Sequence, residues 1–145
     1  MNNHERRVFV EFRYDHVHYL TRDVRALADF FENVFELELI SYEADFKGAA
    51  YAILKLGEGD LRIRGYRPDD APDAFAPALT HGLDHLGVAV DDVAASVARL
   101  VERGAGVDMP PVAAGVGGRM IAFIKGPENI RVEICERPRA SGESD

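Results

Sequence analysis

The chain has one cysteine, Cys135, no tryptophan and no long apolar run. A single cysteine excludes an internal disulfide and any zinc site built from several thiolates. Basic residues are the minority, 17 against 25 acidic ones, and the formal charge of −8 disfavours a nucleic acid or an anionic membrane as partner. Residues 1–12 are charged and lack the apolar stretch of a signal peptide. We therefore expect a cytoplasmic protein without a membrane partner.

An internal repeat is the most informative feature of the 145 residues, whose length suits one domain. Asp15-His16 corresponds to Asp84-His85 at an offset of 69 (85 − 16), and the same offset carries Asp23-Val24 onto Asp92-Val93. Without a gap it also carries GEGDLRIR, residues 57–64, onto GPENIRVE, residues 126–133. Agreement at both ends of the unit indicates two halves of the same architecture.

Each half predicts a strand, a helix and three further strands. Asp23 and Asp92 are typical helix N-caps, and Gly104 is typical of the end of the second helix. The expected helices are residues 24–35 and 93–103, and the expected strands are 15–21, 37–43, 50–56, 61–66, 84–90, 107–110, 119–125 and 130–136. The alternation of residues 8–12 predicts an additional edge strand.

These elements predict an α+β fold of two tandem βαβββ modules whose curved mixed sheets surround a cleft. The modules are residues 14–66 and 83–136, within one domain of residues 1–145. Residues 67–82, rich in Pro, Asp and Ala, form the connector, and residues 137–145 form a flexible tail.

His16 and His85 occupy the same place in the two halves, and Glu133 lies on the last expected strand. Pseudo-twofold packing of the halves is expected to bring the two imidazoles together. Two histidines and one carboxylate form a face that holds Fe²⁺, Mn²⁺ or a similar divalent ion and leaves positions open for substrate. The alternative is that each histidine is a hydrogen-bonded scaffold residue and that Glu133 faces solvent.

The repeated openings, Asp-His followed by Asp seven positions after the histidine, and the closing GPENIRVEI resemble the vicinal oxygen chelate superfamily over residues 14–136. This superfamily includes glyoxalase I, methylmalonyl-CoA epimerase, extradiol dioxygenases, fosfomycin-resistance thiol transferases and bleomycin-binding proteins. The resemblance implies a cleft shared by two half-barrels, with one divalent ion (Fe²⁺, Mn²⁺, Zn²⁺ or Ni²⁺) held from the first and last strands. The matching positions here are again His16, His85 and Glu133.

The fourth position implied by the resemblance falls on Arg64, where glyoxalase I-type and epimerase-type members place a carboxylate. Arginine neither ligates a cation nor acts as a good base. Three roles remain open for Arg64: binding an anionic substrate through paired N–H donors, pairing with a neighbouring acid, or neutralising Glu133 so that no metal binds. The three remaining ligands resemble the extradiol dioxygenase or thiol transferase sets and favour dioxygenase-like chemistry over isomerisation.

His18 lies two residues after His16 and leaves the strand on the same face. It is a candidate general base; it is equally a partner of a ligand, an alternative ligand, or a polar residue in a filled cleft. Tyr51 and Tyr66 are candidates for lining the substrate cavity, although strand aromatics are more often core residues.

The first functional hypothesis is a divalent-metal enzyme acting on a small anionic, oxygen-rich molecule. The second is a metal-free binding protein, like the bleomycin-binding members that the resemblance includes. A third keeps a glyoxalase I-like or epimerase-like lyase or isomerase role, with His18 as base. We expect a homodimer, because half-barrel sheets leave edges that need covering. If the modules are exchanged between subunits, His16 of one chain meets His85 and Glu133 of the other.

Overall fold

The structure, a computed structural model, describes residues 11–72 and 81–138. Each half follows the order βαβββ, which confirms the predicted α+β fold. The first half contains β1 (His16–Leu20), α1 (Val24–Asn33), β2 (Leu39–Phe46), β3 (Ala49–Leu56) and β4 (Gly59–Arg64). The second contains β5 (Leu86–Val90), α2 (Val93–Glu102), β6 (Gly106–Val112), β7 (Ile121–Lys125) and β8 (Arg131–Glu136).

Both helices begin where the sequence predicts. The side chains of Asp23 and Asp92 accept hydrogen bonds of 2.9 Å from the amides of Ala26 and Ala95, which satisfy donors that the first turn leaves free. Gly104 follows α2 with φ +96°, a conformation that side chains rarely adopt, and so allows the chain to turn away. The N-cap aspartates therefore define the start of the helix in each module.

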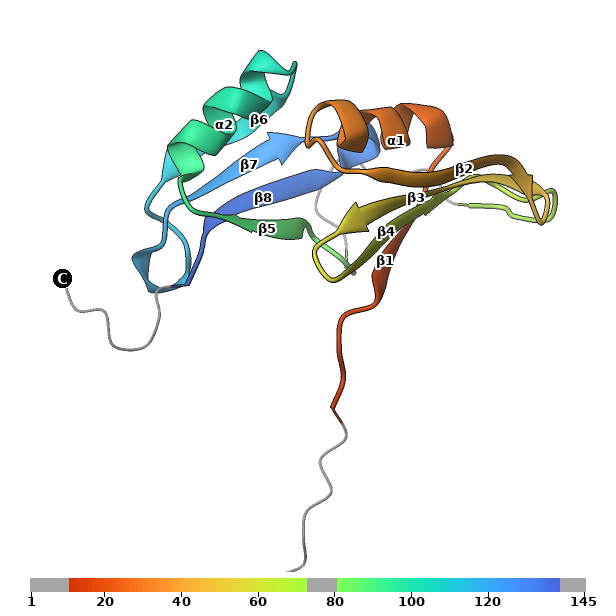
Figure 1. Cartoon of the computed structure of the whole chain (residues 1–145), viewed down its shortest axis with the longest axis horizontal. Helices are drawn as coiled ribbons and strands as arrows, with labels where there is room; N and C mark the ends of the chain where they lie inside the picture. Colours follow the sequence, from red (N-terminus) through yellow and green to blue (C-terminus); the bar gives the residue numbers. More distant parts are fainter. Residues whose placement is uncertain (1–10, 73–80, 139–145) are drawn as a thin grey trace, which may run out of the picture.

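Each module forms a four-stranded sheet with the same topology, β1-β4-β3-β2 and β5-β8-β7-β6. The first strand runs parallel to the last, and the other neighbours are antiparallel. The two sheets lie side by side with both helices on the same side (Figure 1). One face of each sheet is thus covered by a helix. The opposite face carries no helix of the described residues and is called the helix-free face below.

Alternation along the strands divides the side chains between these two faces. Leu61 and Ile63 of β4 are fully buried beneath α1, whereas Arg62 and Arg64 alternate with them toward the helix-free face. One continuous apolar cluster includes residues of both helices and both sheets. The polar candidates of β1 and β4 are therefore displayed on the face opposite the core.

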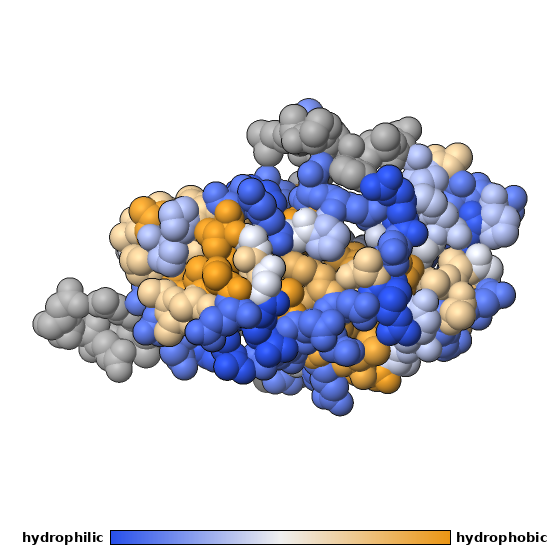
Figure 2. Space-filling model, turned by 90° about the horizontal axis from the view of Figure 1, so that it is seen from above, coloured by the Kyte–Doolittle hydropathy of each residue, from blue (hydrophilic) through white to orange (hydrophobic). Residues whose placement is uncertain are grey.

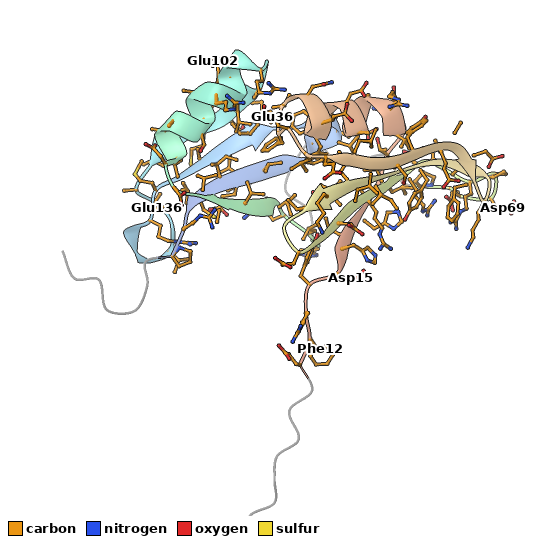
Figure 3. All side chains as sticks on the ribbon, in the orientation of Figure 1. Phe12, Asp15, Glu36, Asp69, Glu102 and Glu136 are labelled. Atoms are coloured by element: carbon orange, nitrogen blue, oxygen red, sulfur yellow. The ribbon has the colours of Figure 1, made fainter. Side chains whose placement is uncertain are left out.

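Charged contacts join the modules on the helix side. Arg99 of α2 donates two hydrogen bonds of 2.7 Å to the Glu36 carboxylate, and Arg103 donates one of 2.6 Å to the carbonyl of Asn33. Glu36 lies between the two helices (Figure 3). Seen from this side, rows of hydrophilic residues border a less polar band across the molecule (Figure 2).

A second contact between the modules lies at the turn before β8. The Glu128 carboxylate accepts hydrogen bonds from the backbone amide and the guanidinium of Arg22, at 3.2 and 2.9 Å. Burial opposes ionisation of Glu128, but the hydrogen bonds from Thr21 and Arg22 outweigh it and lower the pKa of the carboxyl. This ionised side chain links the second module to the residues just before α1.

Several predictions concern residues outside the described ranges. Most of the edge strand predicted at residues 8–12, part of the connector at 67–82 and nearly all of the tail at 137–145 lie there, while residues 11 and 12 are in no strand. Within the described residues, neither helix is long and apolar enough to cross a membrane.

Candidate functional site

His85 and Glu133 meet on the helix-free face of the second sheet. His85 directly precedes β5, Glu133 lies on the neighbouring β8, and the His85 Nε2 and Glu133 Oε2 atoms are 2.9 Å apart. The ring of Phe123, opposite Glu133 on β7, packs edge-on against His85 with centroids 5.0 Å apart. The strand register, rather than sequence proximity, thus brings these two candidate ligands together.

The preceding aspartate orients each of the two histidine rings. The Asp84 carboxylate lies 2.6 Å from His85 Nδ1, and the Asp15 carboxylate lies 2.5 Å from His16 Nδ1. These hydrogen bonds are the largest cause that lowers the pKa of each aspartate. Since an ionised carboxylate only accepts, Nδ1 carries the ring proton and directs Nε2 away from the aspartate. Metal-binding histidines are commonly held in this way.

The His85–Glu133 pair suits a divalent cation. When Nδ1 carries the ring proton, His85 Nε2 and Glu133 Oε2 both present lone pairs to each other. Two lone pairs repel, so a positive group must lie between these atoms: a second ring proton or a shared cation. Two ligand atoms at right angles around one ion, each about 2.1 Å from it, are ~3 Å apart. The 2.9 Å separation of Nε2 and Oε2 fits that requirement.

His16 is not part of this pair in the single chain. Across residues 11–72 and 81–138, no three histidine, cysteine, aspartate or glutamate side chains are grouped so that they could hold a metal ion. Asp15 lies at the start of β1, on the side of the sheets away from the helices (Figure 3). One chain therefore brings two of the three predicted ligands together and keeps the third, on β1, separate.

His18 lies two residues after His16 on the same face of β1, and the residue is exposed although its ring is partly desolvated. Its ring contacts Tyr51 edge-on at 5.5 Å between centroids, and the His16 ring is 6.2 Å away. Burial, followed by the nearby positive charges of His16 and three arginines, lowers the pKa of His18. The imidazole is therefore held neutral at physiological pH, which is the form that a general base requires.

Arg64 and the tyrosines have different surroundings. Arg64 donates to the Asp70 carboxylate at 2.5 Å and to the Gly65 carbonyl at 3.0 Å. Pairing with a neighbouring acid was one of the three roles left open for Arg64 by the sequence. Tyr51 packs between His18 and Phe46, whereas Tyr66 is 40% exposed beyond the end of β4. Substrate binding by Arg64, Tyr51 and Tyr66 stays a prediction.

The strand register corrects one equivalence drawn from the repeat. Gly87 pairs with Glu133 in the second sheet, but its counterpart His18 pairs with Arg62 in the first. The structural counterpart of Glu133 is therefore Arg62, and the assignment of this place to Arg64 was wrong by two residues. The ungapped repeat missed this shift because two residues, 57–58, turn the first hairpin and five residues, 126–130, turn the second.

A cavity of about 590 Å³ lies elsewhere on the second module. It is lined by residues of the 116–119 loop and of the end of β8, among them Arg119, Glu136 and Arg137. It includes neither His85 nor Glu133. This cavity is therefore separate from the two candidate ligands.

Gly59 allows the segment that carries His16 to lie against β4. A Cβ at residue 59 would stand 2.1 Å from the Asp15 carbonyl oxygen and 2.5 Å from the Tyr14 ring. The same carbonyl accepts a 2.9 Å hydrogen bond from the Asp60 amide. A side chain at this position must therefore displace Asp15, the residue that orients the His16 ring.

We expect Gly59→Ala to destabilise the protein by about 1–3 kcal/mol, the usual cost of inserting a methyl group into a filled space. Urea denaturation measures the change. Gly106→Ala is the matched control, because its Cβ would meet only the Lys125 side chain, at an ordinary 3.6 Å. Equal stability of the two variants would contradict the close approach of Asp15 to Gly59.

Comparisons with known proteins agree with the fold. The sequence profile of the Glyoxalase/Bleomycin resistance protein/Dioxygenase superfamily matches residues 13–134. A probable chloroplastic lactoylglutathione lyase of Arabidopsis thaliana is 33% identical over 82 residues, which are 50% of this chain and 23% of that protein. The match thus spans about a quarter of the relative's length.

Solved structures with the same architecture cover 86% of this chain. The structure of SMU.1112c has a TM-score of 0.73 at 26% identity, and 98% of it is covered. A glyoxalase family protein from Enterococcus faecalis has 0.71 at 23%, with 97% covered, and glyoxalase I from Zea mays has 0.68 at 20%, with 44% covered. With its paired βαβββ modules and a profile match over most of its length, the chain belongs to the Glyoxalase/Bleomycin resistance protein/Dioxygenase superfamily.

Proposed function

We propose that this protein is a divalent-metal-dependent enzyme that acts on a small anionic, oxygen-rich molecule, with His16, His85 and Glu133 as ligands. The observation that carries the proposal is the 2.9 Å approach of His85 Nε2 to Glu133 Oε2, with Asp84 holding the opposite ring nitrogen. A histidine held in this way suits a cation shared with the carboxylate. Fe²⁺, Mn²⁺, Zn²⁺ and Ni²⁺ all accept such ligands.

The proposed site is completed between two subunits. His16 has the same orienting contact as His85, but within the described residues of one chain it does not form a ligand group with His85 and Glu133. A homodimer in which the helix-free faces meet lets His16 of one subunit join His85 and Glu133 of the other. The paired modules of one chain then contribute to two sites that are equal by symmetry.

The chain's own residues have distinct roles in this proposal. The bound ion would supply Lewis-acid chemistry by polarising substrate oxygens. His16, His85 and Glu133 hold the ion, and the carboxylates of Asp15 and Asp84 keep the histidine rings oriented. His18, neutral because of its lowered pKa, accepts a proton at its free ring nitrogen. With arginine in the fourth place, a set of two histidines and one carboxylate favours dioxygenase-like chemistry.

A glyoxalase I-like or epimerase-like lyase or isomerase is the second candidate. The match to a probable lactoylglutathione lyase favours it, as does a neutral His18 that can move a proton in place of the second carboxylate. The two candidates differ in what they consume, because a dioxygenase uses O₂ whereas proton transfer exchanges a substrate hydrogen with solvent.

Elemental analysis of protein purified without added metal tests the metal directly, and we expect a divalent ion in stoichiometric amount. A panel of α-hydroxy- and α-ketoacids, thiohemiacetals and catechols is then screened for O₂ uptake and for incorporation of solvent deuterium. O₂ uptake selects the dioxygenase-like reaction, and deuterium incorporation selects the lyase or isomerase. A protein that binds a small molecule but neither binds metal nor turns over any substrate contradicts the proposal and supports a binding protein.

A further inference from the structure

We propose that Arg62 and Arg67, rather than Arg64, form the anion-binding subsite for a carboxylate or phosphate group of the ligand, on the helix-free face of the first sheet beside His18. This inference rests on the proposed function for its place in a reaction, but the subsite itself requires no metal. It assigns the binding of a negative charge to two arginines, each of which has a buried Nε–H without a partner among the described residues.

Arg62 lies at the centre of this face. It pairs in register with His18 of β1 and with Ile53 of β3, so its side chain leaves β4 on the same side as the His18 ring. Its Nη2 atom lies 3.3 Å from Asp60 and 3.7 Å from Asp15. These two carboxylates share one end of the guanidinium, while the Nε–H at the other end is buried and has no hydrogen-bond partner within residues 11–72 and 81–138.

Arg67 repeats this feature three residues beyond the end of β4. Its backbone amide donates to the Asp70 carboxylate at 2.9 Å, which anchors the residue beside the sheet. Its side-chain Nε–H is also buried and finds no partner in the part of the chain that the structure describes. Buried polar groups are nearly always hydrogen-bonded, so two unpaired guanidinium N–H groups on neighbouring segments indicate that something else accepts from them.

Arg64 is the less suitable residue, because among the described residues it has no buried N–H without a partner, unlike Arg62 and Arg67. Asp70 accepts from Arg64 at 2.5 Å, and the Gly65 carbonyl accepts from the same Nη1 atom at 3.0 Å. Asp70 therefore accepts from Arg64 and from the Arg67 backbone, while the Arg67 Nε–H has no acceptor among the described residues. Binding an anion at Arg64 would require breaking this pair.

The surroundings of Arg62 and Arg67 define the class of ligand group. Arg62 pairs in register with His18, and Asp70, which accepts from the Arg64 side chain and from the Arg67 amide, holds the Arg67 segment beside the same face. Tyr51 packs against the His18 imidazole and forms an apolar wall. Planar guanidinium groups bind carboxylate and phosphate oxygens through parallel N–H bonds, and the His18 ring beside Arg62 offers one further hydrogen-bonding atom.

Titration of chelator-treated, ¹⁵N-labelled protein tests the subsite with two probes, inorganic phosphate and acetate. We expect the Nε–H resonances of Arg62 and Arg67 to shift together and to saturate. A response to phosphate alone or to acetate alone supports the subsite and identifies the group that it prefers. Binding should weaken at least about tenfold in Arg62→Lys and in Arg67→Lys, which keep the charge but lose the Nε–H donor.

Arg25→Lys is the control, because Arg25 lies on α1 over the Tyr42 ring, and we expect it to bind as the unchanged protein does. The inference is overturned if neither probe shifts the two resonances, if the Lys variants bind normally, or if Arg64→Lys alone abolishes binding. Because metal is removed throughout, failure here leaves the metal proposal intact. Loss of metal binding in a separate measurement likewise leaves the anion subsite intact.

Discussion

Replacing His85 with alanine is expected to lower the affinity of the protein for Mn²⁺ or Zn²⁺ by about a hundredfold or more. The substitution removes the Nε2 atom that lies 2.9 Å from Glu133 and leaves the carboxylate without its neighbouring ligand. Loss of a residue that only orients a ligand commonly costs 10–100-fold in affinity, so loss of the ligand itself should cost at least the upper figure. Isothermal titration calorimetry and elemental analysis measure the change.

The metal affinity of His85→Ala should be compared with that of two further variants. Asp84→Asn keeps the ring but weakens the contact that orients it, and we expect a smaller loss of about tenfold. His81→Ala is the control, because His81 is exposed and lies outside the candidate site. Unchanged metal content in His85→Ala, with His81→Ala as the reference, would rule out the proposed ligand set.

Heterodimers of His16→Ala and His85→Ala chains are expected to recover metal binding that neither variant shows alone. If each site takes His16 from one subunit and His85 with Glu133 from the other, one of the two sites in such a heterodimer carries both substitutions. The other site is intact. Co-expression with two different affinity tags, followed by purification on both, should therefore give about half of the metal content of the unchanged dimer.

The same experiment distinguishes a shared site from one formed within a chain. If His16 and His85 of one chain belong to the same site, every site in the heterodimer has lost one ligand and no metal is recovered. The control is a dimer in which both chains carry His16→Ala and differ only in their affinity tags. It should bind no metal under either arrangement. A monomeric protein with full metal content would contradict the exchange of ligands between subunits.

The repeat predicted the fold closely because its signals are local. The N-cap aspartates and the alternation of apolar residues define where helices and strands begin, and these preferences act over a few residues. The predicted strand at 61–66 instead occupies Gly59–Arg64, two residues earlier. Its position depends on pairing with β1 and β3 across a short hairpin, and a one-dimensional repeat carries no information about hairpin length.

The candidate site, too, was predicted from the sequence only in part. His85 and Glu133 were predicted as partners and lie 2.9 Å apart, because Glu133 pairs with Gly87, two residues after His85, on the neighbouring strand. The ion pair of Arg64 with Asp70 was one of several alternatives from the sequence, and the role of Arg62 was not foreseen. The unpaired Nε–H groups of Arg62 and Arg67 depend on burial, which only packing defines.

The amino-acid sequence by itself determined the two βαβββ modules, the superfamily and the candidate ligands, since these follow from periodicity, capping and a repeated motif. Only the tertiary structure decided that Arg62 is the counterpart of Glu133 and that His16 stays apart from His85 and Glu133 within one chain. The physical reason is that strand register and module packing minimise the free energy of the whole core, to which each local pattern contributes only a part.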